Sequence, residues 1–195
     1  MRLTRWFLGA AFAAAFLLPM AAKAQSQGAV PPEVAALFDQ ISDIDKLRVL
    51  NPLKLTPDQI DQLISLIQTQ MKDYDKKLAD AAVPPVREIA ADIKETRRKM
   101  LSGASVPKDF DQKVRQIQDD FVKRKQQANQ ELIDSMAAAT RKILTEAQVA
   151  LAAKTAREAT AAALKKDVPG TDAQFFNLYV ANTFIVYPRT VQLLK

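Results

Sequence analysis

The chain has 195 residues, about the length of one domain, and contains neither cysteine nor histidine. Their absence excludes disulfides, thiol nucleophiles, Cys/His zinc sites and every catalytic arrangement that depends on histidine. The 4 glycines never cluster, so no glycine-rich phosphate-binding loop can form. The remaining composition is rich in Ala, Lys and Gln with 7% aromatic residues, which is typical of long helices. We therefore predict an all-α protein.

Residues 1–24 have the organisation of a secretory signal peptide. Arg2 and Arg5 give a positive start, residues 6–20 form an apolar run, and Ala22 to Ala24 make a small-x-small cleavage site. The run is shorter than the roughly 20 residues that a membrane-spanning helix needs, so we expect cleavage and no membrane span in the mature chain. Exported chains without cysteine are typical of a bacterial periplasm, which is the predicted location.

Removal of the signal segment changes the charge balance. The full chain has 28 basic and 22 acidic residues, and the segment takes three basic residues and no acidic residue with it. The mature chain then has a net charge of about +3. This excess is too small to indicate a nucleic-acid partner, and we expect none.

The first part of the mature chain reads as a flexible lead-in followed by helices. A helix over 32–50 opens at two prolines and ends at Asn51 and Pro52. The next helix begins at Thr56, and we expect the proline pair at 84–85 to interrupt it, since each proline removes a backbone donor. The helix then resumes and ends at Gly103. Apolar residues at 3–4 spacing mark one face of the first helix: Val34, Leu37, Phe38, Ile41 and Ile44.

The second part is predicted to hold the longest helix. Pro107 restarts the chain, and one face then stays apolar from Phe110 to Ile143, a rod of roughly 50 Å at 1.5 Å per residue. Another helix runs from Thr145 to about Lys166, where its alanines would allow close approach of a partner helix. A break over 167–170 follows.

The C-terminal segment, residues 171–195, holds five of the thirteen aromatic residues. Thr171 and Gln174 form a capping box, which predicts one further helix. Within the whole chain, only residues 183–187 could pass as a strand. We expect the segment to dock against the helical body, with partner or membrane-surface contact as the alternative.

The predicted organisation has four parts. Residues 1–24 are the signal peptide, residues 25–54 the lead-in and first helix, residues 55–166 a helical core, and residues 167–195 an aromatic helical extension.

Two helix starts share one sequence pattern, in which a threonine caps the helix and a glutamine three residues later reaches back to the cap. A leucine before each threonine can pack against an apolar residue one turn into the helix, which would fix the angle between successive rods. Each start contributes about 1–2 kcal/mol to helix formation. The residues are Leu55, Thr56 and Gln59 in the first copy and Leu144, Thr145 and Gln148 in the second.

This repeated pattern resembles the LTxxQ family of periplasmic proteins, the Spy/CpxP type of stress chaperone and adaptor. The likeness extends over about residues 50–165 and includes the Arg97–Met100 run and the Phe110–Val114 run that follows it. The resemblance implies long bent helices, a helical hairpin, and an antiparallel, cradle-shaped homodimer of coiled-coil type. It also implies ATP-independent binding of unfolded or aggregation-prone proteins in the envelope stress response. In the family the signature residues shape helix corners and do no chemistry.

A client-binding surface would combine scattered cations, for long-range attraction, with modest apolar patches. The cationic candidates are Arg97, Arg98, Lys99, Lys113, Arg115, Lys123, Arg124 and Lys125. The apolar candidates are Met100, Phe110 and Phe121. The alternative for each cation is an ordinary solvated position, and for both phenylalanines a core or dimer contact.

The length of the predicted rod favours an oligomer. A rod of about 50 Å exceeds the span of a compact small domain, and a single copy has too few helices to cover its apolar stripes. We therefore predict a homodimer.

Three functions compete at this level. The first is a periplasmic chaperone or stress adaptor, and the second is a non-catalytic structural or regulatory protein that binds an envelope partner such as a sensor kinase. The third, an enzyme, is disfavoured because adjacent carboxylates such as Asp119 and Asp120 do not converge on one helix face. We expect no catalytic residues, no metal and no cofactor.

Overall fold

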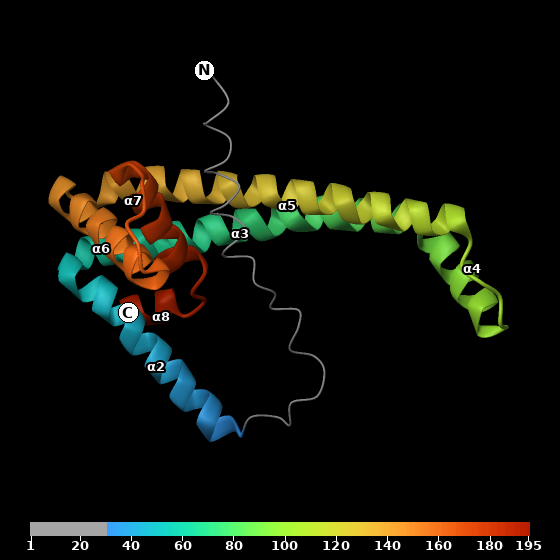
Figure 1. Ribbon diagram of the computed structural model, residues 1–195, viewed down its shortest axis with the longest axis horizontal. Coiled ribbons are helices and arrows are strands. Elements are labelled where there is room, and N and C mark those ends of the chain that lie inside the picture. Colours follow the sequence, from blue (N-terminus) through green and yellow to red (C-terminus); the bar gives the residue numbers. More distant parts are fainter. Residues whose placement is uncertain (1–30) are drawn as a thin grey trace, which may run out of the picture. The chain divides into compact units, whose positions relative to one another are not determined.

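The computed structural model describes residues 31–195, and Figure 1 shows them as a set of α-helices. No strand occurs between residues 31 and 195, which confirms the predicted all-α fold class. The predicted signal segment lies outside the described residues. The α-helices are α2 (Pro32–Leu50), α3 (Pro57–Glu88), α4 (Ala90–Leu101), α5 (Lys108–Ile143), α6 (Glu146–Leu164), α7 (Asp172–Val180) and α8 (Thr190–Leu194).

The chain forms two units that divide after Ser42, inside helix α2. The described part of the first unit is the first half of α2. The carbonyl of Pro31 accepts hydrogen bonds from the N–H groups of Val34 and Ala35, so the helix begins where the sequence predicted. The large apolar side chains of this half-helix are all exposed: Val34, Leu37, Phe38 and Ile41.

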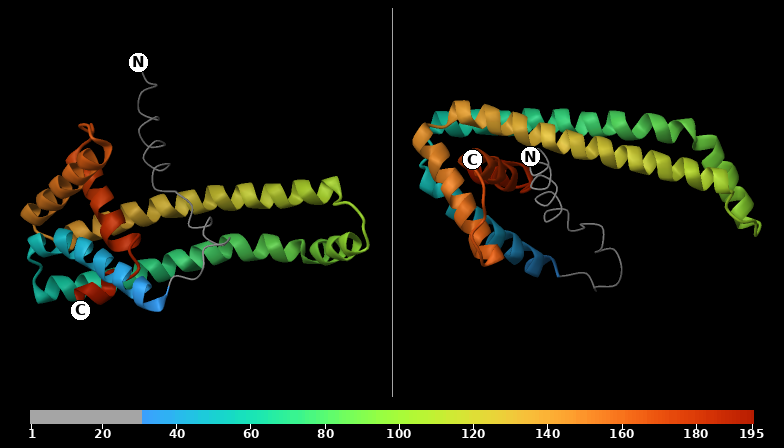
Figure 2. Two further views of the ribbon diagram at one scale, coloured as in Figure 1. Left: turned by 60° about the horizontal axis from the view of Figure 1, so that its bottom comes forward. Right: turned by 45° about the horizontal axis from the view of Figure 1, so that its top comes forward.

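The second unit is built around two long antiparallel helices, α3 and α5, which lie side by side (Figure 2). Helix α5 has 36 residues and is therefore about 54 Å long. Apolar side chains recur every three or four residues along both helices, which gives the pair one seam of the coiled-coil kind. Helix α4 lies at one end of the pair, and α6, α7 and α8 lie at the other (Figure 1).

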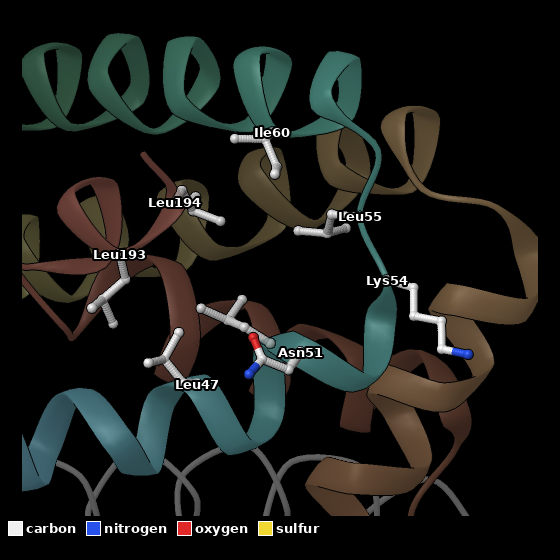
Figure 3. A pocket seen from close by; sticks show the side chains of 8 residues that line it. Leu47, Asn51, Lys54, Leu55, Ile60, Leu193 and Leu194 are labelled. Carbon is white, nitrogen blue, oxygen red and sulfur yellow. The ribbon is translucent and has the colours of Figure 1, made fainter.

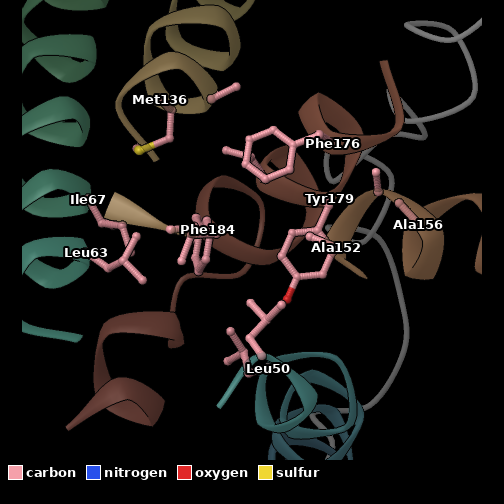
Figure 4. Close-up of a cluster of buried hydrophobic side chains, with 14 of the residues drawn as sticks. Leu50, Leu63, Ile67, Met136, Ala152, Ala156, Phe176, Tyr179 and Phe184 are labelled. Atoms are coloured by element: carbon pink, nitrogen blue, oxygen red, sulfur yellow. The ribbon is translucent and has the colours of Figure 1, made fainter. Parts of the chain in front are cut away.

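The hydrophobic core lies at the end of the α3–α5 pair where α6, α7 and α8 pack (Figure 4). Phe176 is fully buried there, and Tyr179 meets Phe184 edge to face at 6.2 Å between ring centroids. The alanines of α6 let α7 approach closely, as the sequence predicted; those buried are Ala152, Ala153 and Ala156. We call this part of the second unit, residues 43–67 and 128–195, the proximal bundle.

The rest of the hairpin, residues 68–127, contributes no fully buried residue to that core, and we call it the arm. Only Met71 and Tyr74, next to the bundle, pack against the core from this part. Between Ile67 and Ala128 the only buried residue is Thr96. Two helices alone cover one side of each other's apolar stripe, so the seam of the arm remains half-exposed. Its half-buried side chains are Met71, Tyr74, Leu78, Phe110, Val114, Ile117 and Phe121.

The break between α4 and α5 follows the sequence prediction closely. Gly103 has a φ of 87°, in the left-handed region that favours glycine. Its N–H donates to the carbonyl of Met100, and the N–H of Ala104 donates to that of Lys99. These two bonds make a Schellman motif, which satisfies the last carbonyls of α4.

The prediction that the proline pair interrupts the first long helix is wrong. Helix α3 continues through Pro84 and Pro85 to Glu88, and the break falls at Ile89. Each proline removes one hydrogen bond to the carbonyl four residues earlier. The first of these carbonyls belongs to Asp80, which is exposed on the arm, so water can replace the lost donor and the helix persists for one more turn.

The C-terminal segment forms α7, a π-helix (Ala181–Ile185) and α8, so residues 183–187 form no strand. The Thr171–Gln174 capping box is present at the start of α7, which confirms that prediction. The segment docks against the helical body, because five of its aromatic and aliphatic side chains are at most 3% exposed in the core: Phe175, Phe176, Tyr179, Val180 and Phe184.

Polar contacts tie this segment to the second half of α2. Tyr187 and Arg189 both donate hydrogen bonds to the carboxylate of Asp43. Lys46 donates to the carbonyl of Asn182 at 2.9 Å, and burial lowers its pKa. Nothing in the described chain is long and apolar enough to be a membrane-spanning helix.

Candidate functional site

The two repeated corners of the sequence both form the local structure that was predicted. Thr56 is the N-cap of α3, and its side chain accepts a hydrogen bond from the N–H of Gln59, whose side chain accepts one from the Thr56 N–H. Thr145 and Gln148 make the same pair of bonds at the start of α6. Both corners are therefore complete capping boxes.

The structure also brings the two corners into direct contact, which sequence reasoning did not predict. The Gln59 side-chain amide donates to Gln148 Oε1 at 2.8 Å, and the Gln148 amide donates back to Gln59 Oε1 at 3.1 Å. Gln59 also donates to the carbonyl of Ile143, and Gln148 donates to the carbonyl of Leu53. Each glutamine thus caps its own helix and satisfies the chain just before the other helix.

A third capping box, at Thr171 and Gln174, makes no such cross-contact. Its glutamine accepts from its own cap residue alone, so the pairing is particular to the two leucine-threonine corners. The signal that could have found it is the identity of the two motifs, because matching glutamines can form a reciprocal amide pair. The corner residues hold no charge, and both threonine hydroxyls accept capping hydrogen bonds, so their arrangement supports a structural role.

The leucines of both corners, and the apolar residues expected to pack on them, belong to the hydrophobic core or pack against it. Leu144 is buried in the core, and Leu55 lines an open pocket of about 220 Å³ together with Ile60 (Figure 3). The Lys54 ammonium is directed away from the leucine side chains of this pocket in Figure 3. The remaining lining residues are Leu47, Leu50, Asn51, Leu193 and Leu194. Apart from Lys54, the lining residues carry no titratable side chain.

All the predicted client-binding residues lie on the arm. Residues 97–100 end α4, and the other candidates lie on the first half of α5. Lys113 and Lys123 are ten residues apart, or about 15 Å along α5. The run 123–125 turns by about 100° per residue, so these three cations do not share one face. The structure therefore distributes the cations along the arm and does not gather them at one point.

Some of these cations are held by acidic neighbours. Arg98 and Lys99 both pair with Glu95, and the Arg98 hydrogen bond holds the pKa of Glu95 below its ordinary value. Lys113 pairs with Asp92 at 2.8 Å, which links α5 to α4 and raises the pKa of Lys113.

Other cations of the arm form no ion pair with any residue of the described chain. These are Arg97, Arg115, Arg124 and Lys125. Lys123 lies 3.9 Å from Asp120, at the limit of an ion pair, and both side chains are more than half exposed. Exposed ion pairs such as Lys123–Asp120 contribute little to stability. All five of these cations are therefore open to an acidic or polar partner.

The three apolar candidates differ in exposure. Met100 is 49% exposed at the end of α4, next to Leu101 at 78%. Phe110 and Phe121 are half-buried on the seam of the arm, so the structure favours packing within the hairpin for part of each ring. The sequence analysis missed further exposed apolar residues on the arm: Val83, Val86, Ile93 and Val122.

A polar groove of about 540 Å³ lies where the arm joins the proximal bundle. Lys77 of α3 and Glu131 of α5 form an ion pair across it, and the hydrogen bond from Lys77 lowers the pKa of Glu131. Tyr74 donates to the side chain of Asn129 nearby, and burial raises the pKa of Tyr74. These contacts fasten α3 to α5, and the mixture of both charge signs selects no single ligand class.

Comparison of the chain with protein-family models, with curated protein sequences and with solved structures found no match.

Proposed function

We propose that the protein is an exported, ATP-independent chaperone or stress adaptor of the Spy/CpxP type that binds unfolded or aggregation-prone proteins along its arm. In this proposal the protein acts in the periplasm after cleavage of residues 1–24, pairs with a second copy and performs no catalysis. The corner residues hold the helices at fixed angles, and the arm carries the binding surface.

One observation carries the proposal: a 60-residue arm with an apolar seam adds no fully buried hydrophobic residue to the core, and only Met71 and Tyr74 at its near end pack against the core. An apolar surface of this extent, flanked by unpaired cations, suits a partner that is itself partly unfolded. Met100 and Leu101 add a flexible contact at the far end, and methionine adapts to many shapes. The cations attract at long range without fixing one geometry.

The test is suppression of aggregation of an unrelated denatured protein, measured by light scattering with stoichiometric amounts of this protein. A variant in which Arg97, Arg98, Lys123, Arg124 and Lys125 are changed to Gln removes five arm cations. We expect the wild type to suppress scattering and the variant to suppress it less.

A matched control removes the same charge from the proximal bundle by changing Lys54, Lys142, Lys154, Lys165 and Lys166 to Gln. These lysines are all exposed, and the control should suppress aggregation as the wild type does. A wild-type protein without effect would contradict the chaperone proposal and favour a regulatory protein with a dedicated envelope partner. Equal losses in both variants would show that net charge, rather than the arm, determines binding.

A further inference from the structure

The first half of α2 presents an apolar face whose large side chains are exposed among the described residues 31–195. Val34, Leu37, Phe38 and Ile41 are between 39% and 61% exposed. Their spacing of three and four residues places them on one side of the helix, in the a/d pattern of a coiled-coil seam. A helix with such a stripe is stable in water when another apolar surface covers the stripe.

The apolar seam of the arm is also incompletely covered. The seam has two helices and is half-exposed along its length, so a third helix laid along the pair would complete a three-helix bundle. The first half of α2, residues 32–42, has 11 residues and is about 16 Å long, so it can cover a stretch of α5 of the same length.

Charge distinguishes between possible partners of α2. Residues 31–42 contain Glu33 and Asp39 and no basic residue, whereas residues 81–126 contain eleven basic and seven acidic residues. Pairing of two arms, or of two α2 helices, would bring like net charges together, while α2 against an arm brings opposite charges together. An anionic membrane is disfavoured as well, because helices that bind such surfaces are rich in Lys and Arg.

The α2 helix cannot reach the far half of the arm in its own chain. Leu50 ends α2 in the core, and Val34 lies 16 residues, or about 24 Å, before it. The far half of the arm begins at about residue 81, which is about 36 Å along α3 from its start at Pro57. For the far half of the arm, a second copy is therefore needed to supply the covering helix.

We propose that the first half of α2 of one copy packs along the basic, half-exposed seam of the arm of a second copy. The arrangement is reciprocal, so two identical contacts close the dimer. This inference rests on the proposed pairing of two copies and adds the surfaces that meet.

The absence of cysteine from the chain allows a direct test by disulfide cross-linking of introduced thiols. One purified copy carries Leu37→Cys, and a differently tagged copy carries Val122→Cys or Val86→Cys, which are exposed on the two helices of the arm. After mixing and mild oxidation, we expect a disulfide between the two tags with at least one arm variant. Ala36→Cys, about 150° around α2 from the centre of the stripe, is the matched control and should cross-link at least tenfold less.

Sedimentation equilibrium on the same samples separates the possible failures. A monomer at micromolar concentration overturns both the pairing of copies and this contact. A dimer in which Leu37→Cys bonds to neither arm variant, or bonds instead to Leu37→Cys of the other copy, overturns this contact alone. If the protein is a monomer and still suppresses aggregation, the chaperone proposal holds and only the pairing of copies is wrong.

Discussion

The proximal bundle and the arm are built from the same two helices, α3 and α5, yet one is a packed core and the other is a half-covered pair. In the bundle, α7, the π-helix and α8 cover the stripe that α3 and α5 leave open, and α6 packs on α7. Along the arm the stripe continues at the same spacing without that cover. The difference teaches that helical periodicity alone indicates which face is apolar, while the number of neighbouring helices determines whether that face is buried.

The largest expected effect comes from removing the cover of the bundle. Deletion of residues 171–195 takes away α7, the π-helix and α8, and with them most of the large buried aromatic side chains. We expect the cooperative thermal transition to disappear, measured by circular dichroism at 222 nm. A truncated chain that melts at the wild-type temperature but no longer binds clients would show instead that the segment is an interaction site.

A single phenylalanine in each region compares bundle and arm directly. Phe176→Ala should lower the free energy of unfolding by about 3–5 kcal/mol, because Phe176 is fully buried and stacks with Arg141 at 4.5 Å. Phe121→Ala on the arm should cost about half as much, in proportion to its partial burial. Urea unfolding measures both.

The same two variants also test whether a second copy packs on the seam of the arm. If a second copy packs on the seam, the cost of Phe121→Ala should rise with protein concentration, while that of Phe176→Ala should stay constant. A cost for Phe121→Ala that equals that of Phe176→Ala in dilute protein would contradict the division into core and arm.

The glutamine pair joins the starts of α3 and α6 at one end of the bundle. Its removal should have an intermediate effect on the free energy of unfolding. Gln148→Ala removes both hydrogen bonds between the two glutamines and leaves the carbonyl of buried Leu53 without the Gln148 donor, so we expect a loss of about 1–3 kcal/mol. In a double-mutant cycle with Gln59→Ala, the combined loss should be at least about 0.5 kcal/mol less than the sum of the single losses. Gln174→Ala is the control, since that residue caps only its own helix. If the losses of Gln59→Ala and Gln148→Ala were strictly additive, the result would argue against an interaction between the two glutamines.

The smallest expected effect concerns the ion pair at the root of the arm. Lys77 lowers the pKa of Glu131, so the pair stabilises the fold above the ordinary pKa of 4.5 and loses this contribution as the pH falls through the lowered value. Glu131→Gln should therefore lower the melting temperature slightly at pH 7 and leave it unchanged at pH 2. A difference that grows toward low pH would have the wrong sign for this explanation.

Local signals predicted the helix ends well, because the information lies within a few residues. The threonine caps, the glycine after α4 and the proline before α5 each act on their own turn. The persistence of α3 beyond Pro85 could not be predicted in this way, since it depends on how exposed the preceding turn, around Asp80, is in the folded arm.

Contacts between distant residues account for the rest of what the sequence could not predict. Neither the Gln59–Gln148 pair nor the attachment of Tyr187 and Arg189 to Asp43 leaves a periodic signal in the chain. The candidate cations are all on the arm, as their clustering in the sequence suggested, yet which of them are neutralised by Glu95 and Asp92 became apparent only from the three-dimensional structure.

The reciprocal glutamine pair has a consequence for the order of events during synthesis. Its two members are 89 positions apart, so the first corner emerges from the ribosome long before its counterpart has been synthesised. Until then α3 starts with its own cap alone, and nothing closes the junction. The final angle between the rods is therefore acquired late, in a step that joins the two halves of the polypeptide, and interruption of synthesis within α5 would yield a hairpin without a closed base.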